Sequence, residues 1–237
     1  MRLATRTLAM IAVGGTLIFG AVSPASANTT LDPAAQSFMT QQFQKYNVPQ
    51  SQWAGLFEKE ATNVAFDSAT GVAPTSTEKF RVGITDYTLK RFADGSFSAS
   101  SLERPTIPTA RAAGGVTPLT ITGCSYYYGT GVASYSNCKV MQDTPTATLW
   151  FKADYYRSSG AAGVSRVSSW DWNIQCAAGT CTLNYLGIVK STWAPGAGQQ
   201  ARGRIRAYAT VVGGLGSAYP YVDIVVTPSS ATSSANF

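Results

Sequence analysis

Apolar and polar residues alternate through much of the second half of the chain, and this period of two constrains the fold more than any other feature. Within residues 147–156, the apolar residues that would share one side of an extended chain are Leu149, Phe151 and Tyr155. The other side would carry Trp150, Lys152, Asp154 and Tyr156. Successive side chains of a β-strand point to opposite faces, so the pattern predicts a half-buried strand. A similar run covers residues 168–175, and further runs, each bounded by Gly or Pro, cover residues 182–192, 201–212 and 221–227.

Several short strands without helical runs between them predict a mainly β chain, with an antiparallel β-sandwich-like domain over residues 119–228. The preceding residues, 106–118, are rich in Pro, Ala and Gly and are predicted to be a linker. Residues 229–237 are mostly Ser, Ala and Thr and are predicted to form a flexible tail. Within residues 168–175, the alternation predicts one face shared by Trp170, Trp172 and Ile174.

The segment before the linker, residues 28–105, predicts a small module of a helical hairpin and a β-hairpin. Asp32 followed by Pro33 is a helix start signal, and Pro49 separates two helices. After an expected linker at residues 67–77, Asp94-Gly95 between two strand-like runs predicts a tight hairpin turn. Apolar residues at helical spacing are expected to face inward: Phe38, Met39, Phe43, Tyr46, Trp53, Leu56 and Phe57.

The first 27 residues have the three zones of a secretory signal peptide. Arg2 and Arg6 give a positive start, residues 8–22 are uncharged and mostly apolar, and a small-residue stretch ends at Ala27. We expect cleavage after Ala27 and release as a secreted, extracellular protein without a stable membrane anchor. A retained anchor is the alternative, but the glycine-containing apolar zone falls short of the ~20 apolar residues that a span needs.

An even number of cysteines in an exported chain predicts disulfide bonds, here two. Three pairings are possible. We favour Cys124 with Cys138 and Cys176 with Cys181, because short loops lose the least chain entropy on closure. No pair has the CxxC spacing of a zinc site, so neither a metal nor another cofactor is predicted.

The absence of histidine narrows the chemistry that the chain can perform. It excludes Ser-His-Asp, Cys-His and HExxH sites, all of which need an imidazole. Glycoside hydrolysis needs only two carboxylates, and Asp154, Asp171 and Asp223 are the candidates on strand faces. The simpler interpretation puts each of them on a solvated face. We therefore favour a protein without enzymatic activity.

Charge gives little indication of a nucleic-acid partner. Charged residues make up 13% of the chain, and the formal net charge of +6 falls to +4 without Arg2 and Arg6. Three arginines that share one strand face, continued by Tyr208, could bind an anionic wall polymer or a lipid surface: Arg202, Arg204 and Arg206. A solvated face that keeps the sheet from pairing with its neighbours is the simpler interpretation.

Aromatic residues are the stronger functional signal. The predicted loop between Cys124 and Cys138 contains three consecutive tyrosines, and two more rings lie on the polar face of residues 147–156. Flat rings with polar neighbours stack on sugars, although packing under another strand or against the helices is the simpler interpretation. The candidate ligand-binding residues are therefore Tyr126, Tyr127, Tyr128, Trp150 and Tyr156.

Several short motifs carry a resemblance: Tyr46-Asn47-Val48-Pro49, Asp67-Ser68, Pro74-Thr75-Ser76-Thr77, Arg91-Phe92-Ala93-Asp94-Gly95-Ser96, Glu103-Arg104-Pro105 and Gly123-Cys124-Ser125. With these motifs the chain resembles secreted proteins of actinomycetes that have no assigned function. The motifs are structural, namely a helix break, a hairpin turn and a cysteine. The resemblance implies a Gram-positive secreting host and transfers no catalytic residue.

Three functional hypotheses follow. The first is a secreted, non-enzymatic protein that binds polysaccharide or another cell-envelope polymer. The second is a small histidine-free carbohydrate hydrolase. The third is an extracellular inhibitor that uses the Cys124 to Cys138 loop as its contact surface. The sequence carries no signal for an oligomeric state.

Overall fold

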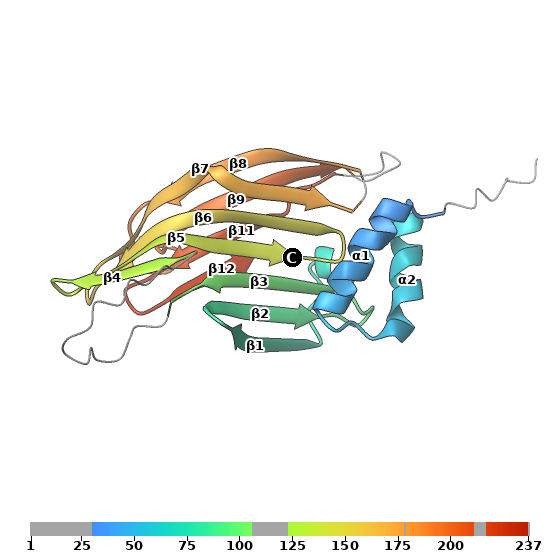
Figure 1. Ribbon diagram of the computed structural model, residues 1–237, viewed down its shortest axis with the longest axis horizontal. Helices are drawn as coiled ribbons and strands as arrows, with labels where there is room; N and C mark the ends of the chain where they lie inside the picture. Colours follow the sequence, from blue (N-terminus) through green and yellow to red (C-terminus); the bar gives the residue numbers. More distant parts are fainter. Residues whose placement is uncertain (1–29, 106–122, 178, 211–216, 237) are drawn as a thin grey trace, which may run out of the picture.

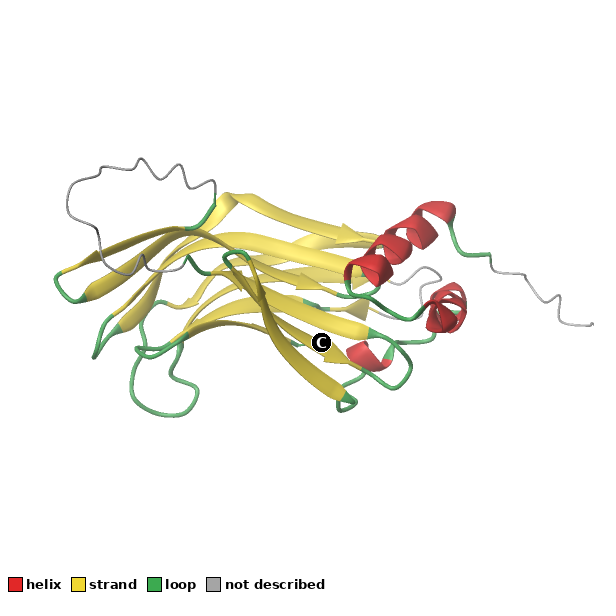
Figure 2. Ribbon diagram, turned by 60° about the horizontal axis from the view of Figure 1, so that its bottom comes forward, coloured by secondary structure: helices red, strands yellow, loops and turns green. Residues whose placement is uncertain are grey.

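A computed structural model describes residues 30–105, 123–177, 179–210 and 217–236. Two N-terminal helices precede antiparallel strands in two packed sheets, which confirms the predicted mainly β, sandwich-like fold (Figures 1 and 2). The expected signal peptide and the predicted linker at 106–118 lie outside the described residues. No helix in the described ranges is long and apolar enough to cross a membrane.

Helix α1 (Pro33–Lys45) begins where the sequence predicts. Asp32 Oδ1 accepts a hydrogen bond of 2.7 Å from the N–H of Ala34, which satisfies one of the free N–H groups of the first turn. Met39 and Phe43, four residues apart, are fully buried on one face of the helix. The start and the inward face of this helix follow directly from local sequence.

Helix α2 (Gln50–Ala61) packs against α1 through aromatic rings. The Phe43 ring lies 5.6 Å from that of Trp53 and 5.5 Å from that of Phe57, and Leu56 is fully buried. Trp53 Nε1 donates a hydrogen bond to the carbonyl of Val48, so the polar edge of the indole is satisfied where the chain turns between the helices. The predicted helical hairpin is confirmed.

Both sheets are entirely antiparallel. Sheet A has the order β1-β2-β3-β5-β6-β7, with β4 also paired to β5; sheet B has the order β10-β9-β11-β12, with β8 also paired to β9. The 3-10 turn η1 (Asp67–Ala69) precedes the first strand. The strand bounds are β1 (Ser76–Val82), β2 (Thr85–Arg91), β3 (Phe97–Glu103), β4 (Ser125–Gly129), β5 (Val132–Asp143), β6 (Ala147–Arg157), β7 (Ala162–Cys176), β8 (Thr180–Lys190), β9 (Ala201–Thr210), β10 (Ser217–Ala218), β11 (Tyr221–Val226) and β12 (Ala231–Ala235).

The main core lies between the two sheets. Leu149 and Phe151 of β6 are fully buried against Ile205 of β9 and Ile224 of β11. Along β6, buried and half-buried residues alternate as the sequence predicts. The opposite, outer face of sheet A is partly covered by the helices, which form a second, smaller core with β2 and β3.

The expected division into two modules is wrong, because one sheet runs through both. Residues 99–102 of β3 pair with residues 140–143 of β5, so Leu102 lies opposite Val140. Residues 231–235 are strand β12 on the edge of sheet B, so the predicted flexible tail is also wrong over that range. Both errors have the same physical cause. The strands that pair are far apart in the sequence or show little alternation of apolar and polar residues, and the composition of the segments between them does not indicate the pairing.

The linker expected at residues 67–77 contains η1 and the start of β1 instead. All seven residues of β1 are exposed, and apolar and polar residues alternate only over its last four positions. The hairpin between β2 and β3 is confirmed, but its connection spans residues 92–96 and not a two-residue turn. Only Gly95, with φ 87°, has the left-handed backbone there. The Asp94 carboxylate accepts a hydrogen bond from the N–H of Ser96, which stabilises the turn.

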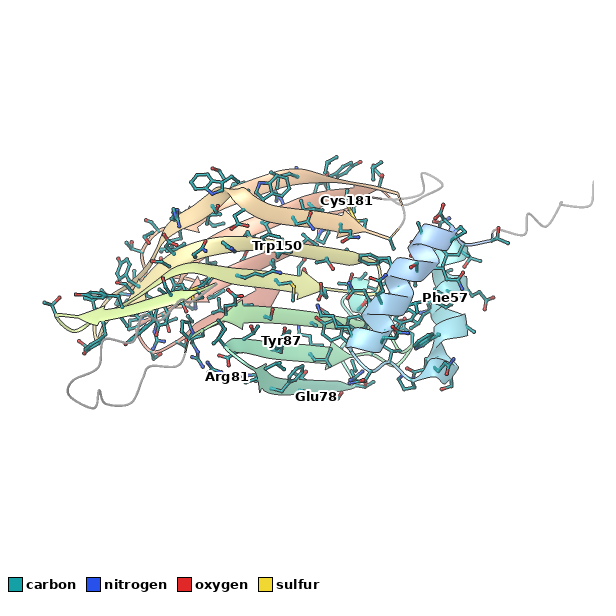
Figure 3. All side chains as sticks on the ribbon, in the orientation of Figure 1. Phe57, Glu78, Arg81, Tyr87, Trp150 and Cys181 are labelled. Carbon is teal, nitrogen blue, oxygen red and sulfur yellow. A yellow bond between two sulfur atoms is a disulfide. The ribbon has the colours of Figure 1, made fainter. Side chains whose placement is uncertain are left out.

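The two expected disulfides are present. Cys124 pairs with Cys138 at the base of the β4–β5 hairpin, with Cα atoms 4.1 Å apart, and Cys176 pairs with Cys181 between β7 and β8, at 6.0 Å. Figure 3 shows Cys181 at the β7–β8 connection, where the two sheets adjoin. The second disulfide therefore links sheet A to sheet B on one side of the sandwich.

Strand β7 departs from the expected face assignment at Trp170. The register with β6 shifts between the Phe151–Trp172 and Ala153–Val167 pairs, so four residues of β7 lie opposite one residue of β6. Such a bulge reorients the side chains within it. Trp172 and Ile174 pack against the core as predicted, whereas Trp170 is 76% exposed.

Candidate functional site

The outer face of sheet A carries a row of side chains that crosses five strands. Strand register aligns them in the order Phe80, Tyr87, Ser101, Met141 and Trp150. Directly opposed residues of antiparallel strands point to the same face, so these five side chains form one line beside α1. We call them the outer-face row, and Figure 3 shows Tyr87 and Trp150 on it, to one side of the helices.

The outer-face row has an aromatic group at each end and a buried floor. Phe80 and Tyr87 stack with ring centroids 5.1 Å apart, and Phe80 is 39% exposed. Ser101 and Met141 are buried and lie between this ring pair and Trp150. Three strand spacings separate Tyr87 from Trp150, which corresponds to about 14 Å. The arrangement suits an elongated ligand that contacts rings at both ends.

Cations surround the Trp150 end of the row. Lys139 Nζ lies 4.5 Å from the centre of the Trp150 ring. Lys139 is also paired directly across the sheet with Lys152, whose ammonium lies 2.7 Å from Asp171. Burial lowers the pKa of Lys139, and the neighbouring positive charge of Lys45 adds to this, whereas Glu103 opposes it. An anion bound beside Lys139 would therefore pair with an ammonium group that is not fully hydrated.

Helix α1 is held beside the outer-face row by a buried carboxylate. Asp143 is fully buried and accepts hydrogen bonds from Lys45 Nζ (2.6 Å), the Tyr46 hydroxyl (2.5 Å) and the Thr148 hydroxyl (2.6 Å). Burial and then the negative charge of Asp143 raise the pKa of Tyr46 far above its ordinary value, so the phenol stays a proton donor. The helix end is thereby fixed next to the row formed by Met141 and Trp150.

The structure separates the five ligand-binding candidates. Trp150, Tyr156 and Tyr127 belong to the outer face of sheet A, because Tyr127, Ser134 and Tyr156 are aligned in register. Tyr156 lies six residues from Trp150, about 20 Å along the strand. The other two candidates, Tyr126 and Tyr128, belong to the inner face. The five residues do not form one surface.

The tyrosine segment is a hairpin and not a loop. Thr130 and Gly131, with φ of 50° and 79°, connect β4 to β5 in a two-residue turn. Tyr126 packs against Tyr135 at 5.1 Å, and this ring contact joins it to the core. Tyr127 and Tyr128 are 71% and 62% exposed near the hairpin tip. Only these two are available to a partner.

The three candidate carboxylates for hydrolysis are all engaged by cations. Asp154 accepts bonds from Arg166, Asp171 pairs with Lys152, and Asp223 pairs with two arginines. They lie on three different strands, on the outer faces of two different sheets. No two of them face each other across a described cleft, which a two-carboxylate mechanism requires.

The arginine row is more structural than its sequence pattern indicates. Asp223 is only 1% exposed although it lies on the outer face of sheet B. Arg204 donates to both of its carboxylate oxygens, at 2.6 and 2.8 Å, and Arg202 lies 3.7 Å away. The guanidinium of Arg204 also covers the Tyr221 ring at 3.8 Å. The expectation that Asp223 is solvated is therefore wrong, because the arginines cover it.

The sequence pattern missed three residues of the outer-face row and its surroundings: Phe80, Tyr87 and Lys139. Phe80 lies in a strand that alternates only over its last four residues, and Lys139 reaches Trp150 only through β5–β6 pairing. The stacking of Tyr87 on Phe80 could be predicted only from the pairing register of β1 and β2.

Within the described ranges, no three His, Cys, Asp or Glu side chains gather as metal ligands. Comparisons with known proteins give no match to a protein-family model, to a curated protein or to a solved structure. The arrangement of residues on the surface is therefore the basis for a functional proposal.

Proposed function

We propose that the chain is a secreted, non-enzymatic protein that binds an acidic polysaccharide of the cell envelope through the outer-face row. The observation that carries the proposal is the Lys139–Trp150 pair, in which an ammonium lies 4.5 Å from an indole ring beside a buried floor. Sugars present apolar faces that stack on rings, and acidic substituents pair with ammonium groups. One end of the row thus supplies both contacts.

The other residues of the outer-face row are arranged to contact a long, extended ligand. Phe80 and Tyr87 offer a second ring contact about 14 Å from Trp150, and the Ser101 hydroxyl lies between them. The row lies on strands, which hold side chains more rigidly than loops do. Secretion is supported by the signal-like first 27 residues and by two disulfides, which form in oxidising compartments. An actinomycete host stays part of the proposal.

The proposal is tested by affinity electrophoresis in gels that contain polygalacturonate or neutral dextran. The wild-type protein should be retarded by polygalacturonate, and Trp150→Ala should weaken retardation about tenfold, equivalent to about 1.4 kcal/mol. Lys139→Gln should reduce the preference for the acidic polymer. Trp170→Ala is the matched control, because Trp170 is exposed but lies outside the row. Absence of retardation by either polymer, or equal retardation of Trp150→Ala and wild type, would refute the proposal.

The inhibitor hypothesis stays a prediction with one supporting observation. The β4–β5 hairpin is closed at its base by the Cys124–Cys138 disulfide and exposes Tyr127 and Tyr128. A rigid projecting hairpin with exposed rings is a suitable contact surface. Stable complex formation with a co-secreted protease, lost on Tyr127→Ala, would favour it over polysaccharide binding.

A further inference from the structure

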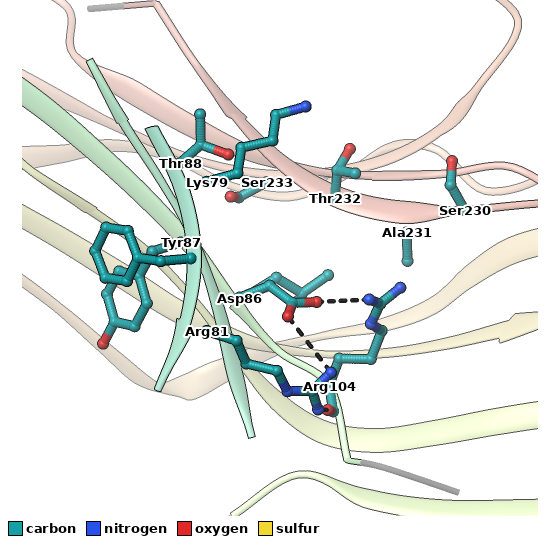
Figure 4. A pocket seen from close by; sticks show the side chains of 12 residues that line it. Lys79, Arg81, Asp86, Tyr87, Thr88, Arg104, Ser230, Ala231, Thr232 and Ser233 are labelled. Atoms are coloured by element: carbon teal, nitrogen blue, oxygen red, sulfur yellow. Dashed lines mark hydrogen bonds and ion pairs between the residues drawn. The ribbon is translucent and has the colours of Figure 1, made fainter. Parts of the chain in front are cut away.

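Sheet A extends past the edge of sheet B and leaves a groove between them. Strand β12 is the last strand of sheet B and packs over β3, so β2 and β1 continue beyond it. The groove has a volume of about 450 Å³ and is lined by β1, β2 and residues 230–233 (Figure 4). It lies on the inner face of sheet A; Phe80 and Tyr87 of the outer-face row also line it, but Figure 4 shows the Tyr87 ring turned away from the groove, toward the outer face.

The floor of the groove changes from apolar to charged at the last core residue. Leu102 of β3 is paired with Asp86 of β2, and Asp86 is paired with Arg81 of β1. From β3 to β1, the buried Leu102 is thus succeeded on the same face by the ion pair of Asp86 with Arg81. The groove is a polar extension of the sandwich and not an unfilled part of its core.

Positive charge predominates in the groove. Figure 4 shows Asp86 between Arg104, at 2.8 Å, and Arg81, at 3.5 Å. Lys79 also lines the groove, is exposed and makes no ion pair within the described residues. With three cations and one carboxylate, the groove has a formal charge of +2 and favours an anionic occupant.

Within the part of the chain that the structure describes, the β12 side of the groove offers backbone groups without a hydrogen-bond partner. The N–H of Thr227 donates to the carbonyl of Ser230 at the turn between β11 and β12. Hydrogen-bonded and non-hydrogen-bonded pairs alternate along an antiparallel ladder, so Thr232 is in a bonded pair with β11, whereas its neighbours Ala231 and Ser233 are not. The N–H and C=O groups of Ala231 and Ser233 therefore point away from β11, toward the groove. Unpaired groups of this kind accept an additional strand.

β12 also lacks the features that usually protect an edge strand. Its sequence, Ala231–Ala235, has small uncharged side chains and no proline. By contrast, the edge strand β1 contains Glu78, Lys79 and Arg81. The groove therefore combines a strand that can be extended with a wall of cations.

We propose that this groove binds an acidic peptide segment in an extended conformation, which adds to β12 as a further strand of sheet B. The peptide backbone pairs with Ala231 and Ser233, and its acidic side chains face Lys79 and Arg104. Because the floor is polar, the occupant is a reversible partner and is not required for folding. This inference concerns a different face from the polysaccharide proposal and does not depend on it.

The test uses a fluorescein-labelled octapeptide of alternating Thr and Glu and measures its binding by fluorescence anisotropy. Lys79→Glu should weaken binding about tenfold, whereas the matched variant Lys190→Glu, on β8 at the far edge of sheet B, should not change it. Trp150→Ala should also have no effect. An octapeptide with Lys in place of Glu should not bind.

Backbone pairing is tested separately by amide hydrogen exchange in the wild-type protein, which avoids any variant that fails to fold. Saturation with the Thr/Glu peptide should slow exchange of the Ser233 N–H about tenfold or more, and leave that of Thr232, already bonded to β11, unchanged. Ser233→Pro should abolish binding. Unchanged exchange at Ser233, no binding of the acidic peptide, or equal displacement of the peptide by polygalacturonate would overturn strand addition.

Discussion

Asp94 provides the most direct test of how the hairpin turn is tied to the helices. Its carboxylate accepts hydrogen bonds from the N–H of Ser96 (2.9 Å), the N–H of Asp67 (3.0 Å) and Lys59 Nζ (2.7 Å). The side chain is 9% exposed. One group therefore joins the β2–β3 turn, η1 and α2, and Asp94→Ala removes all three connections.

The expected loss is worked from these three bonds. A hydrogen bond to a charged group contributes about 1.5 kcal/mol or more, and Lys59 keeps a weaker contact with Asp67 at 3.4 Å. We expect Asp94→Ala to lower the free energy of unfolding by about 3 to 4 kcal/mol at neutral pH. Asp94→Asn keeps an acceptor for Ser96 but loses the charge, and should cost about 1 to 2 kcal/mol.

The effect should depend on pH in a defined direction. Burial raises the pKa of Asp94, but the hydrogen bonds from Asp67, Lys59 and Ser96 outweigh it and hold the pKa below its ordinary value. A depressed pKa in the folded state stabilises the fold above the unfolded pKa of about 3.9. That contribution disappears as the pH falls through the folded-state pKa.

Urea denaturation followed by tryptophan fluorescence measures these differences. The gap between wild type and Asp94→Asn should be largest near pH 7 and should shrink on acidification below about pH 4. Asp171→Asn, which removes a more exposed ion pair with Lys152, is the control and should cost under about 1 kcal/mol. A gap of equal size at pH 7 and pH 3 would show that the charge of Asp94 does not stabilise the fold.

Two further predictions concern the interior and the arginine row. Tyr155 is 1% exposed and its hydroxyl has no hydrogen-bond partner among the described residues, so Tyr155→Phe should raise the free energy of unfolding by about 1 kcal/mol in urea titrations; destabilisation would mean that the hydroxyl is satisfied. Asp223→Ala leaves Arg204 uncompensated and should cost about 3 to 5 kcal/mol, whereas Asp223→Ala with Arg204→Leu should recover part of the loss; equal stability of the single and double variants would contradict this.

Local signals in the sequence predict those parts of the structure that local physics determines. Asp32 and Pro33 start α1, and the alternation along residues 147–156 matches the buried face of β6. Cysteine spacing indicates both disulfides, because short loops close easily. In each case the residues that form the feature lie close together in the chain.

The features that the sequence did not predict depend on partners far along the chain. Strand β1 is exposed on every residue and alternates only over residues 79–82, and β12 has only small side chains, so neither carries a full strand pattern. Asp223 lies on the expected face but is buried, because Arg204 from another strand covers it. The outer-face row likewise exists only once Phe80, Tyr87 and Trp150 are brought into register.

The pairing of β3 with β5 has a consequence for how the chain folds. Leu102 and Val140 are opposed across 38 positions of sequence, so the β2–β3 hairpin cannot complete its sheet until β5 is available. A fragment that ends at residue 105 would leave the edge of β3 without hydrogen-bond partners, and such an edge recruits other chains. The helices and the sandwich should therefore unfold in a single cooperative transition, and an N-terminal fragment should aggregate where the whole chain does not.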